Sequence, residues 1–244
     1  MRNIKSYKPI EGEAFHVHTR RCRHASAEPD VMYVEKAIEL GAPRIVFTDH
    51  VPIPGNFDNR MKVDELPEYI DSIRQLKEDY RDKIEVLCGL EAEYSPSFET
   101  HYRKLSEIEG LDILVIGQHF YEKPDGGFSF SDEDKTQEYI GLCEAMIQGM
   151  KTGLFQVVVH PDRAFRRRET FGEMERDLSR RIIQTAEAYG ICLEKNYSSM
   201  ITKKYYRPEF WEMVPSSVTV IYGIDAHSVK ELEDGLTKRK QLFL

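Results

Sequence analysis

Seven short apolar segments recur along this chain, and longer stretches with a helical pattern separate them. Each segment is rich in β-branched residues, as buried strands are. The segments span residues 14–18, 44–50, 84–94, 111–120, 155–162, 191–196 and 218–227. The helical patterns fall near 31–41, 64–82, 98–108, 132–152, 171–189 and 228–242. This alternation predicts an α/β fold of parallel strands covered by helices, either an open doubly wound sheet or a barrel.

Each of the seven predicted strands ends in residues that can bind a metal ion or a polar group. In chain order these residues are His16 and His18, Asp49 and His50, Glu91 and Glu93, His119, His160 and Asp162, Glu194 and Asn196, and Asp225 and His227. The carboxyl ends of parallel strands converge on one mouth in a barrel, whereas an open sheet spreads them along a line. The pattern therefore favours a (β/α) barrel of about seven strands, with the chemistry at its mouth.

Composition limits the partners and the compartment that we expect. The chain has 244 residues, of which 41% are hydrophobic and 31% are charged, and it shows no linker or internal repeat, so we expect one domain over residues 1–244. Its formal net charge of -8 gives no general attraction to nucleic acid or to an anionic membrane. Four cysteines without a C-x-x-C pair argue against a disulfide scaffold. Without an apolar run of membrane-spanning length or a signal peptide, we expect a cytoplasmic protein that binds a small molecule.

Histidine and carboxylate side chains make up most of these strand ends, and together they suit zinc, iron(II) or manganese. His16 and His18 are two residues apart on an extended strand, so their side chains should point to the same face. Glu91 could bridge two ions through its two oxygens, and Asp225 could complete the ligands of the first ion. His24 follows in the first loop. The sequence therefore predicts clustered divalent metal ions at the mouth.

Seven motifs, taken in order, are similar to those of a known family. They are FHVHTRRCRHA, FTDHVPIPGNFDNRM, EVLCGLEAEY, ILVIGQHFY, VVVHPD, LEKN and YGIDAHS. They extend over nearly the whole chain, which resembles the polymerase and histidinol phosphatase (PHP) family and, within it, the histidinol-phosphatase group. The resemblance implies a distorted seven-stranded TIM-like barrel, which agrees with the strand count above.

The resemblance also implies three divalent ions, zinc, iron or manganese, at the mouth of the barrel. The implied ligands, ion by ion, are His16, His18, Glu91 and Asp225 for the first, Glu91, His119 and His160 for the second, and His24, His50 and His227 for the third. Glu91 would bridge the first two ions. Many relatives have an aspartate in the first loop, and the histidine at position 24 suits zinc or iron better than magnesium.

Phosphate-ester hydrolysis is the chemistry that such a site implies, because clustered cations lower the pKa of a bound water and neutralise phosphoryl oxygens. Our hypothesis is that a hydroxide bridging the ions attacks a phosphomonoester in line, so that no protein nucleophile is needed. We expect L-histidinol phosphate as the substrate, hydrolysed to L-histidinol and phosphate in histidine biosynthesis. Cys22, inside the first motif, is interpreted as a small buried thiol.

Basic residues after the fifth and sixth predicted strands are candidates for holding the phosphate. We expect Arg163 to do so first, because it is nearest to His160, and then Arg207 and Lys203. Phe120, at the end of the fourth segment, is a candidate for stacking on an imidazole-bearing substrate.

Two other functions stay open as alternatives. Histidinol phosphatases commonly read N-T-S-G-x-R after the sixth strand, whereas this chain reads NYSSMITKKYYR, with Ile201 where the arginine is expected. A related phosphoesterase that acts on a nucleotide or sugar phosphate is therefore the first alternative. A polymerase-associated PHP module, acting as an exonuclease or a structural accessory, is the second, and the acidic net charge and the lack of an appended polymerase speak against it.

Overall fold

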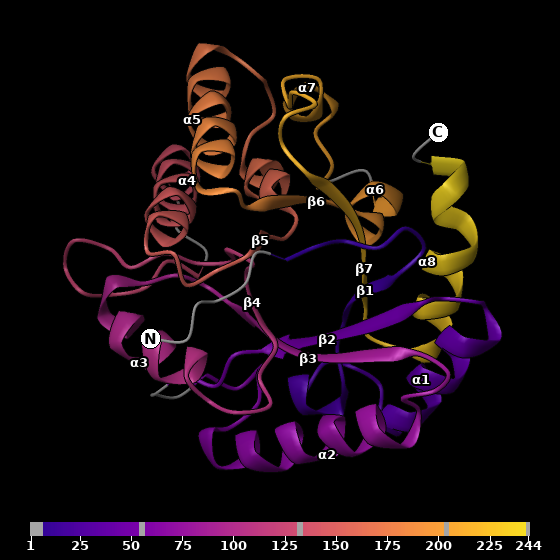
Figure 1. The fold of residues 1–244 in the computed structure, drawn as a ribbon. Coiled ribbons are helices and arrows are strands. Elements are labelled where there is room, and N and C mark those ends of the chain that lie inside the picture. Colours follow the sequence, from indigo (N-terminus) through magenta and orange to yellow (C-terminus); the bar gives the residue numbers. More distant parts are fainter. Residues whose placement is uncertain (1–6, 54–56, 131–133, 203–204, 243–244) are drawn as a thin grey trace.

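Seven parallel strands close into a barrel in the order of the chain, with the last strand beside the first (Figure 1). The computed structural model describes residues 7–53, 57–130, 134–202 and 205–242. The strands are β1 (Ala14–Val17), β2 (Arg44–His50), β3 (Glu85–Ala92), β4 (Ile113–Ile116), β5 (Val157–Val158), β6 (Cys192–Asn196) and β7 (Val220–Ala226). The predicted barrel and its strand number are confirmed, and the closed order excludes the open sheet.

Helices lie outside the barrel; all but α8, which follows the last strand, lie between successive strands in the chain (Figure 1). The longer ones, each overlapping a predicted helical pattern, are α1 (Asp30–Glu39), α2 (Leu66–Asp79), α3 (Glu99–Ser106), α4 (Lys135–Lys151), α5 (Glu173–Tyr189) and α8 (Val229–Leu242). Short elements that were not predicted are α6 (Tyr197–Thr202), α7 (Pro208–Trp211) and the 3-10 helices η1 (Arg20–Cys22), η2 (Val63–Glu65), η3 (Pro96–Phe98) and η4 (Pro161–Arg167). On α2, the apolar face with Tyr69, Ile73 and Leu76 is buried, as its spacing predicts.

Inward-facing side chains fill the barrel in layers. The apolar layer near the start of the strands consists of Phe15, Val46, Ile113, Val115, Val157, Val159, Cys192 and Ile221. Because side chains alternate along a strand, Gly117 and Gly223 face inward two positions after members of this layer. A Cβ atom at Gly117 would overlap the carboxylate of Glu91, and one at Gly223 would overlap the carboxylate of Glu194. These glycines therefore make room for buried carboxylates near the mouth.

Three strand-end residues adopt the left-handed backbone region, which residues other than glycine rarely occupy. The φ angle is 70° at His16, 34° at His160 and 61° at Asp225. At His16 the register between β1 and β2 shifts between Phe15 and Val17, as in a β-bulge. His16 and His18 point to the same side, as predicted, since both approach Glu91. The reason is the bulge at His16 and not regular strand alternation, because Phe15 already faces the interior. Backbone strain of this kind is concentrated at functional sites.

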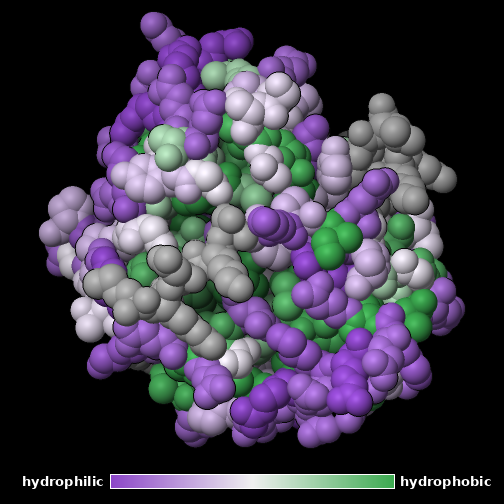
Figure 2. Space-filling view, in the orientation of Figure 1, coloured by the Kyte–Doolittle hydropathy of each residue, from purple (hydrophilic) through white to green (hydrophobic). Residues whose placement is uncertain are grey.

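Hydrophilic side chains cover most of the face shown in Figure 2, and hydrophobic ones show in the gaps between them. Large exposed apolar residues are scattered over separate elements, for example Met32 on α1, Tyr189 on α5 and Ile201 on α6. Among the helices that the structure describes, none is both long and apolar enough to cross a membrane.

Candidate metal centre

His16, His18, Glu91 and Asp225 come together where the strands end. Nε2 of His18 lies 3.4 Å from Glu91 Oε2 and 3.4 Å from Asp225 Oδ1. Nε2 of His16 lies 3.4 Å from Glu91 Oε2 and 3.7 Å from Asp225 Oδ1. All four side chains are buried. The structure thus places the four residues expected at the first ion around one point.

Glu91, His119 and His160 form a second group, whose ligand atoms all lie within 4.8 Å of one another. Nε2 of His160 lies 3.0 Å from Glu91 Oε1, and Nε2 of His119 lies 3.8 Å from the same oxygen. Oε1 of Glu91 therefore faces this group, while Oε2 faces His16 and His18. A carboxylate shared by two ions requires this division of its oxygens.

The third expected set is brought together in part. His50 and His227 form a group with His18 whose ligand atoms lie within 4.8 Å of one another. The rings of His18 and His227 stack, with centroids 4.2 Å apart. His24 is exposed, and its ring centroid is 4.5 Å from that of His227 and 5.3 Å from that of His50. His24 thus borders the group, and His18, expected only at the first ion, lies inside it.

Several buried ring nitrogens in this cluster lack a hydrogen-bond partner. Within the described part of the chain these include His18 Nε2, His50 Nδ1 and His227 Nε2. His50 Nδ1 lies 3.2 Å from Glu91 Oε2 without bonding to it. Burial lowers the pKa of His18 to about 3 and holds that of His50 well below its usual value, so both imidazoles are neutral, as metal ligation requires. Neutral, unpaired nitrogens beside carboxylates fit a divalent cation.

The carboxylates favour positive charge at the centre of the cluster. Burial by itself lowers the pKa of His16, but Glu194, Asp225 and Glu91 outweigh it and hold that pKa well above its usual value. Burial likewise raises the pKa of Glu91, yet His50 and His16 hold it well below its usual value, so Glu91 is ionised. Imidazole and carboxylate donors together suit zinc, iron(II) and manganese. The residues present therefore fit divalent metal binding.

Glu194, which we did not predict as a ligand, forms hydrogen bonds to two of the candidate ligands. Its Oε1 accepts a hydrogen bond from Nδ1 of His16 at 2.8 Å, and its Oε2 accepts one from the backbone N–H of His160 at 2.9 Å. Glu194 is fully buried. A carboxylate on the far nitrogen fixes the ring orientation and tautomer of a ligating imidazole. The signal for Glu194 was its place at a predicted strand end.

Glu93 orients the ring of His119 in the same way. Its Oε1 accepts a hydrogen bond from Nδ1 of His119 at 3.0 Å. Arg60 in turn donates to both oxygens of Glu93, at 2.8 and 3.2 Å, and is itself 3% exposed. Arg60 comes from the loop after β2; it lies inside the second motif, but we assigned it no role from the sequence.

Arg163 is the predicted phosphate contact that lies inside the cluster. Its Nη2 donates to Asp225 Oδ2 at 2.5 Å, and its Nη1 lies 3.4 Å from His119 Nε2. The ring of Tyr205 packs over the guanidinium, 5.6 Å from its centre. A cationic fork beside the candidate ligands is suited to binding phosphate oxygens.

The other predicted substrate contacts have different surroundings. Arg207 donates to the backbone oxygen of Arg168 at 2.5 Å and thereby stabilises the end of η4. Phe120 is 1% exposed, and its ring stacks on Phe57 with centroids 5.7 Å apart. Because protein covers this ring, the structure does not support the predicted stacking of Phe120 on a substrate. Lys203 lies outside the described residues.

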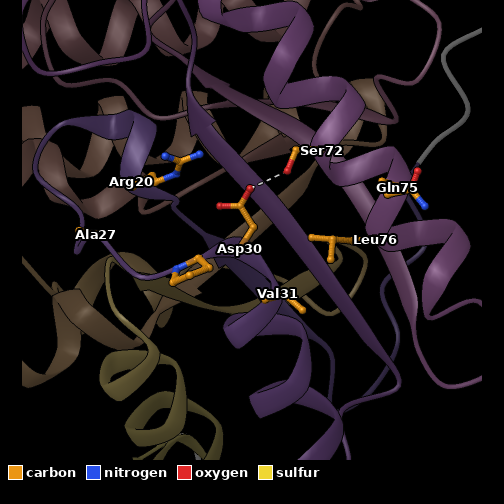
Figure 3. Close-up of a pocket in the computed structure, with 8 residues that line it drawn as sticks. Arg20, Ala27, Asp30, Val31, Ser72, Gln75 and Leu76 are labelled. Atoms are coloured by element: carbon orange, nitrogen blue, oxygen red, sulfur yellow. Dashed lines mark hydrogen bonds between the residues drawn. The ribbon is translucent and has the colours of Figure 1, made fainter.

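A separate hollow of about 540 Å³ lies on the outside of the barrel between η1, α1 and α2 (Figure 3). Arg20, Asp30, Ser72 and Leu76 are among the described residues that line it, and the nine candidate ligands are not. Ser72 Oγ donates to Asp30 Oδ2 across the hollow at 3.0 Å. Asp30 also accepts a hydrogen bond from Nη1 of Arg21 at 2.8 Å, which links this wall to the loop that carries His24.

Comparison with known proteins identifies a family and several relatives. Residues 14–198 match the family described as PHP domain. A Deinococcus radiodurans protein named "Probable histidinol-phosphatase" is 26% identical over 234 residues, which cover 89% of this chain and 86% of the relative. The histidinol-phosphatase of Bacillus subtilis is 29% identical over 157 residues, which cover 59% of each chain.

A solved structure shares the fold. It is the histidinol phosphate phosphatase of Lactococcus lactis subsp. lactis, in complex with zinc, L-histidinol and phosphate. The superposition has a TM-score of 0.73 at 21% sequence identity and covers 94% of this chain and 91% of that one.

Proposed function

The chain belongs to the PHP domain family, and from that premise we propose that it is a metal-dependent phosphomonoester hydrolase acting on L-histidinol phosphate. The observation that carries the proposal is that two groups of imidazole and carboxylate donors share Glu91, and a third group, of imidazoles, shares His18 with the first. The guanidinium of Arg163 lies beside them. The relatives named histidinol-phosphatase support the substrate. The reaction would convert L-histidinol phosphate and water into L-histidinol and phosphate.

We propose that three divalent ions, zinc, iron(II) or manganese, occupy the cluster. Their proposed ligands, ion by ion, are His16, His18, Glu91 and Asp225; Glu91, His119 and His160; and His24, His50 and His227. When bound, such ions lower the pKa of water and neutralise negative charge on phosphoryl oxygens. Glu194 and Glu93 hold the rings of His16 and His119 by their Nδ1 atoms, which keeps each Nε2 directed at Glu91.

Arg163 is proposed to bind the phosphate. Its guanidinium is directed at the cluster by Asp225 and is covered by the ring of Tyr205. In this position it can donate to phosphate oxygens. Lys203 remains a proposed contact from its place in the sequence alone, after the sixth strand.

Hydrolysis of a substrate panel tests the proposed function. We expect zinc-loaded protein to hydrolyse L-histidinol phosphate with a kcat/KM at least about 100-fold above that for nucleotides, sugar phosphates and short single-stranded DNA. A margin of this size corresponds to about 2.7 kcal/mol of transition-state discrimination. Ile201, exposed on α6 where an arginine is expected, is the observation that favours another ester. Equal rates on the small esters would support phosphoesterase activity but contradict the assignment of histidinol phosphate as the substrate.

Alanine variants of Arg163 and Arg207 distinguish a residue that binds the phosphate from one that stabilises η4. We expect Arg163→Ala to lower kcat/KM for histidinol phosphate by about 10- to 100-fold, mainly through KM, because charged hydrogen bonds contribute about 1.5–3 kcal/mol. Arg207→Ala should change KM little and lower thermal stability instead, since Arg207 bonds to backbone of η4. Steady-state kinetics and melting curves of both variants check this. The assignment of Arg163 fails if Arg207→Ala raises KM and Arg163→Ala does not.

A further inference from the structure

Cys22, at the end of η1, contacts three of the candidate metal ligands and is fully buried. Its Sγ lies 3.1 Å from Nδ1 of His18 and 3.3 Å from the backbone nitrogen of His50. Its backbone oxygen lies 2.7 Å from Nδ1 of His24. Cys22 is therefore a buried thiol, as the sequence predicts. In addition, it contacts candidate metal ligands, which we did not predict from the sequence.

The direction of these hydrogen bonds follows from the groups around the thiol. The S–H of Cys22 donates to Asp49 Oδ1 at 3.3 Å. Because a carboxylate oxygen can only accept, the proton of this contact lies on the sulfur. Sulfur lone pairs are then left to accept from the N–H of His50 and from Nδ1–H of His18.

This arrangement fixes the tautomers of two imidazoles. With its proton on Nδ1, His18 presents an unprotonated Nε2, which lies 3.4 Å from Glu91 Oε2 and lacks a hydrogen-bond partner. His24 donates from Nδ1 to the carbonyl of Cys22, so its Nε2 is also left free to ligate. A single residue thus sets which nitrogen two candidate ligands offer.

We propose that Cys22 is a positioning residue for the metal centre: it orients His18 and His24 by their Nδ1 atoms and thereby sets the affinity for the zinc ions that these two histidines are proposed to bind. The proposal rests on the metal dependence proposed above and not on the identity of the substrate. It assigns no bond between Cys22 and a metal ion.

Direct ligation by the thiolate is the competing arrangement, because His18, Cys22 and Asp49 offer atoms within 4.8 Å of one another. The contacts of Asp49 argue against it. Besides the thiol, Asp49 accepts from the backbone N–H of Thr19 at 2.5 Å and from the Thr19 hydroxyl. With these donors in place and the Cys22 sulfur already accepting from His50, the group is satisfied without a cation.

The loop that carries Cys22 is anchored independently of the thiol. Arg21 donates to Asp30 Oδ2 at 2.8 Å and to Glu68 Oε2 at 2.7 Å. Ser72 donates to the same oxygen of Asp30, as Figure 3 shows. Removing the sulfur should therefore leave η1 in place while it takes away the acceptor for His18. This makes Cys22→Ala a clean test.

Zinc affinity is the measurement that tests the proposal, with zinc alone and no substrate. We expect Cys22→Ala to lose about 10- to 100-fold in affinity for at least one zinc ion in competition with a chromophoric chelator. Cys22→Ser, whose hydroxyl can still accept, should recover most of that loss. Cys143→Ala is the matched control, because Cys143 is as fully buried but lies on α4. Wild-type zinc affinity in Cys22→Ala, with stability matched to the control, would overturn the proposal.

Two measurements on the unmodified protein keep the proposal testable even if a variant fails to fold. Long-range ¹H–¹⁵N spectra of the zinc-loaded protein should show His18 and His24 protonated at Nδ1 and not at Nε2. The cobalt-loaded protein should lack a thiolate-to-cobalt charge-transfer band. Protonation at Nε2 of His18, or a thiolate band, would contradict the positioning role. Neither result depends on whether the protein hydrolyses histidinol phosphate.

Discussion

Gly117→Ala is expected to lower kcat/KM for histidinol phosphate by about 10³-fold, although Gly117 is not a ligand and gains only one methyl group. A Cβ atom at this position would overlap the Glu91 carboxylate, which faces both donor groups. Glu91 would have to leave the place where its two oxygens lie between them. Metal ions at such sites supply several kcal/mol of charge stabilisation, and a loss of about 4 kcal/mol corresponds to 10³-fold in rate.

Zinc content and kinetics of Gly117→Ala, beside Glu91→Gln, check this expectation. Both variants should bind less zinc and be similarly slow, because each removes the same carboxylate from the cluster. Gly127→Ala is the matched control: the added Cβ would meet side-chain atoms of Asp125 and Lys123 at 3.2 Å or more. It should leave zinc content and rate unchanged. Wild-type activity and zinc content in Gly117→Ala would mean that Glu91 is not central to the site.

The strand count and the cluster of strand-end residues could be predicted because both depend on local patterns. Short β-branched runs alternate with amphipathic stretches, and a closed parallel barrel brings all strand ends to one mouth. Convergence suggested that Glu91 could bridge two ions, whereas its pairing with two particular sets of histidines came from the resemblance to the PHP family. Glu194 and Glu93 carried the same signal, but their role as holders of His16 and His119 depends on distances that no pattern gives.

Non-local packing determined what the sequence could not predict. The bulge at His16 arises where β1 pairs with both β2 and β7, and a φ of 70° is uncommon for any residue other than glycine. Arg60 reaches Glu93 from a loop, and neighbouring aromatic rings cover Phe120. A residue's place in the chain shows that it is near the mouth, whereas its partners decide whether it faces substrate or protein.

Removal of the metal ions is expected to abolish hydrolysis, with a fall in kcat/KM of at least about 10³-fold, because the charge stabilisation they supply is lost. It should also destabilise the fold. An ion that binds only the folded chain adds about 2.7 kcal/mol to the free energy of unfolding when its free concentration is 100 times its Kd. Chelator-treated protein should therefore melt at a lower temperature, and added zinc should restore both the rate and the melting temperature.

The most direct test of the metal-dependent phosphatase is a zinc titration of the metal-free chain, in which bound zinc and the initial rate of L-histidinol phosphate hydrolysis are measured on the same samples. The ligand groups around Glu91 predict no hydrolysis without metal and a rate that rises with bound zinc until more than one ion is held per chain. A metal-free chain that hydrolyses the ester at the full rate, or a folded chain that binds no zinc, would contradict the account.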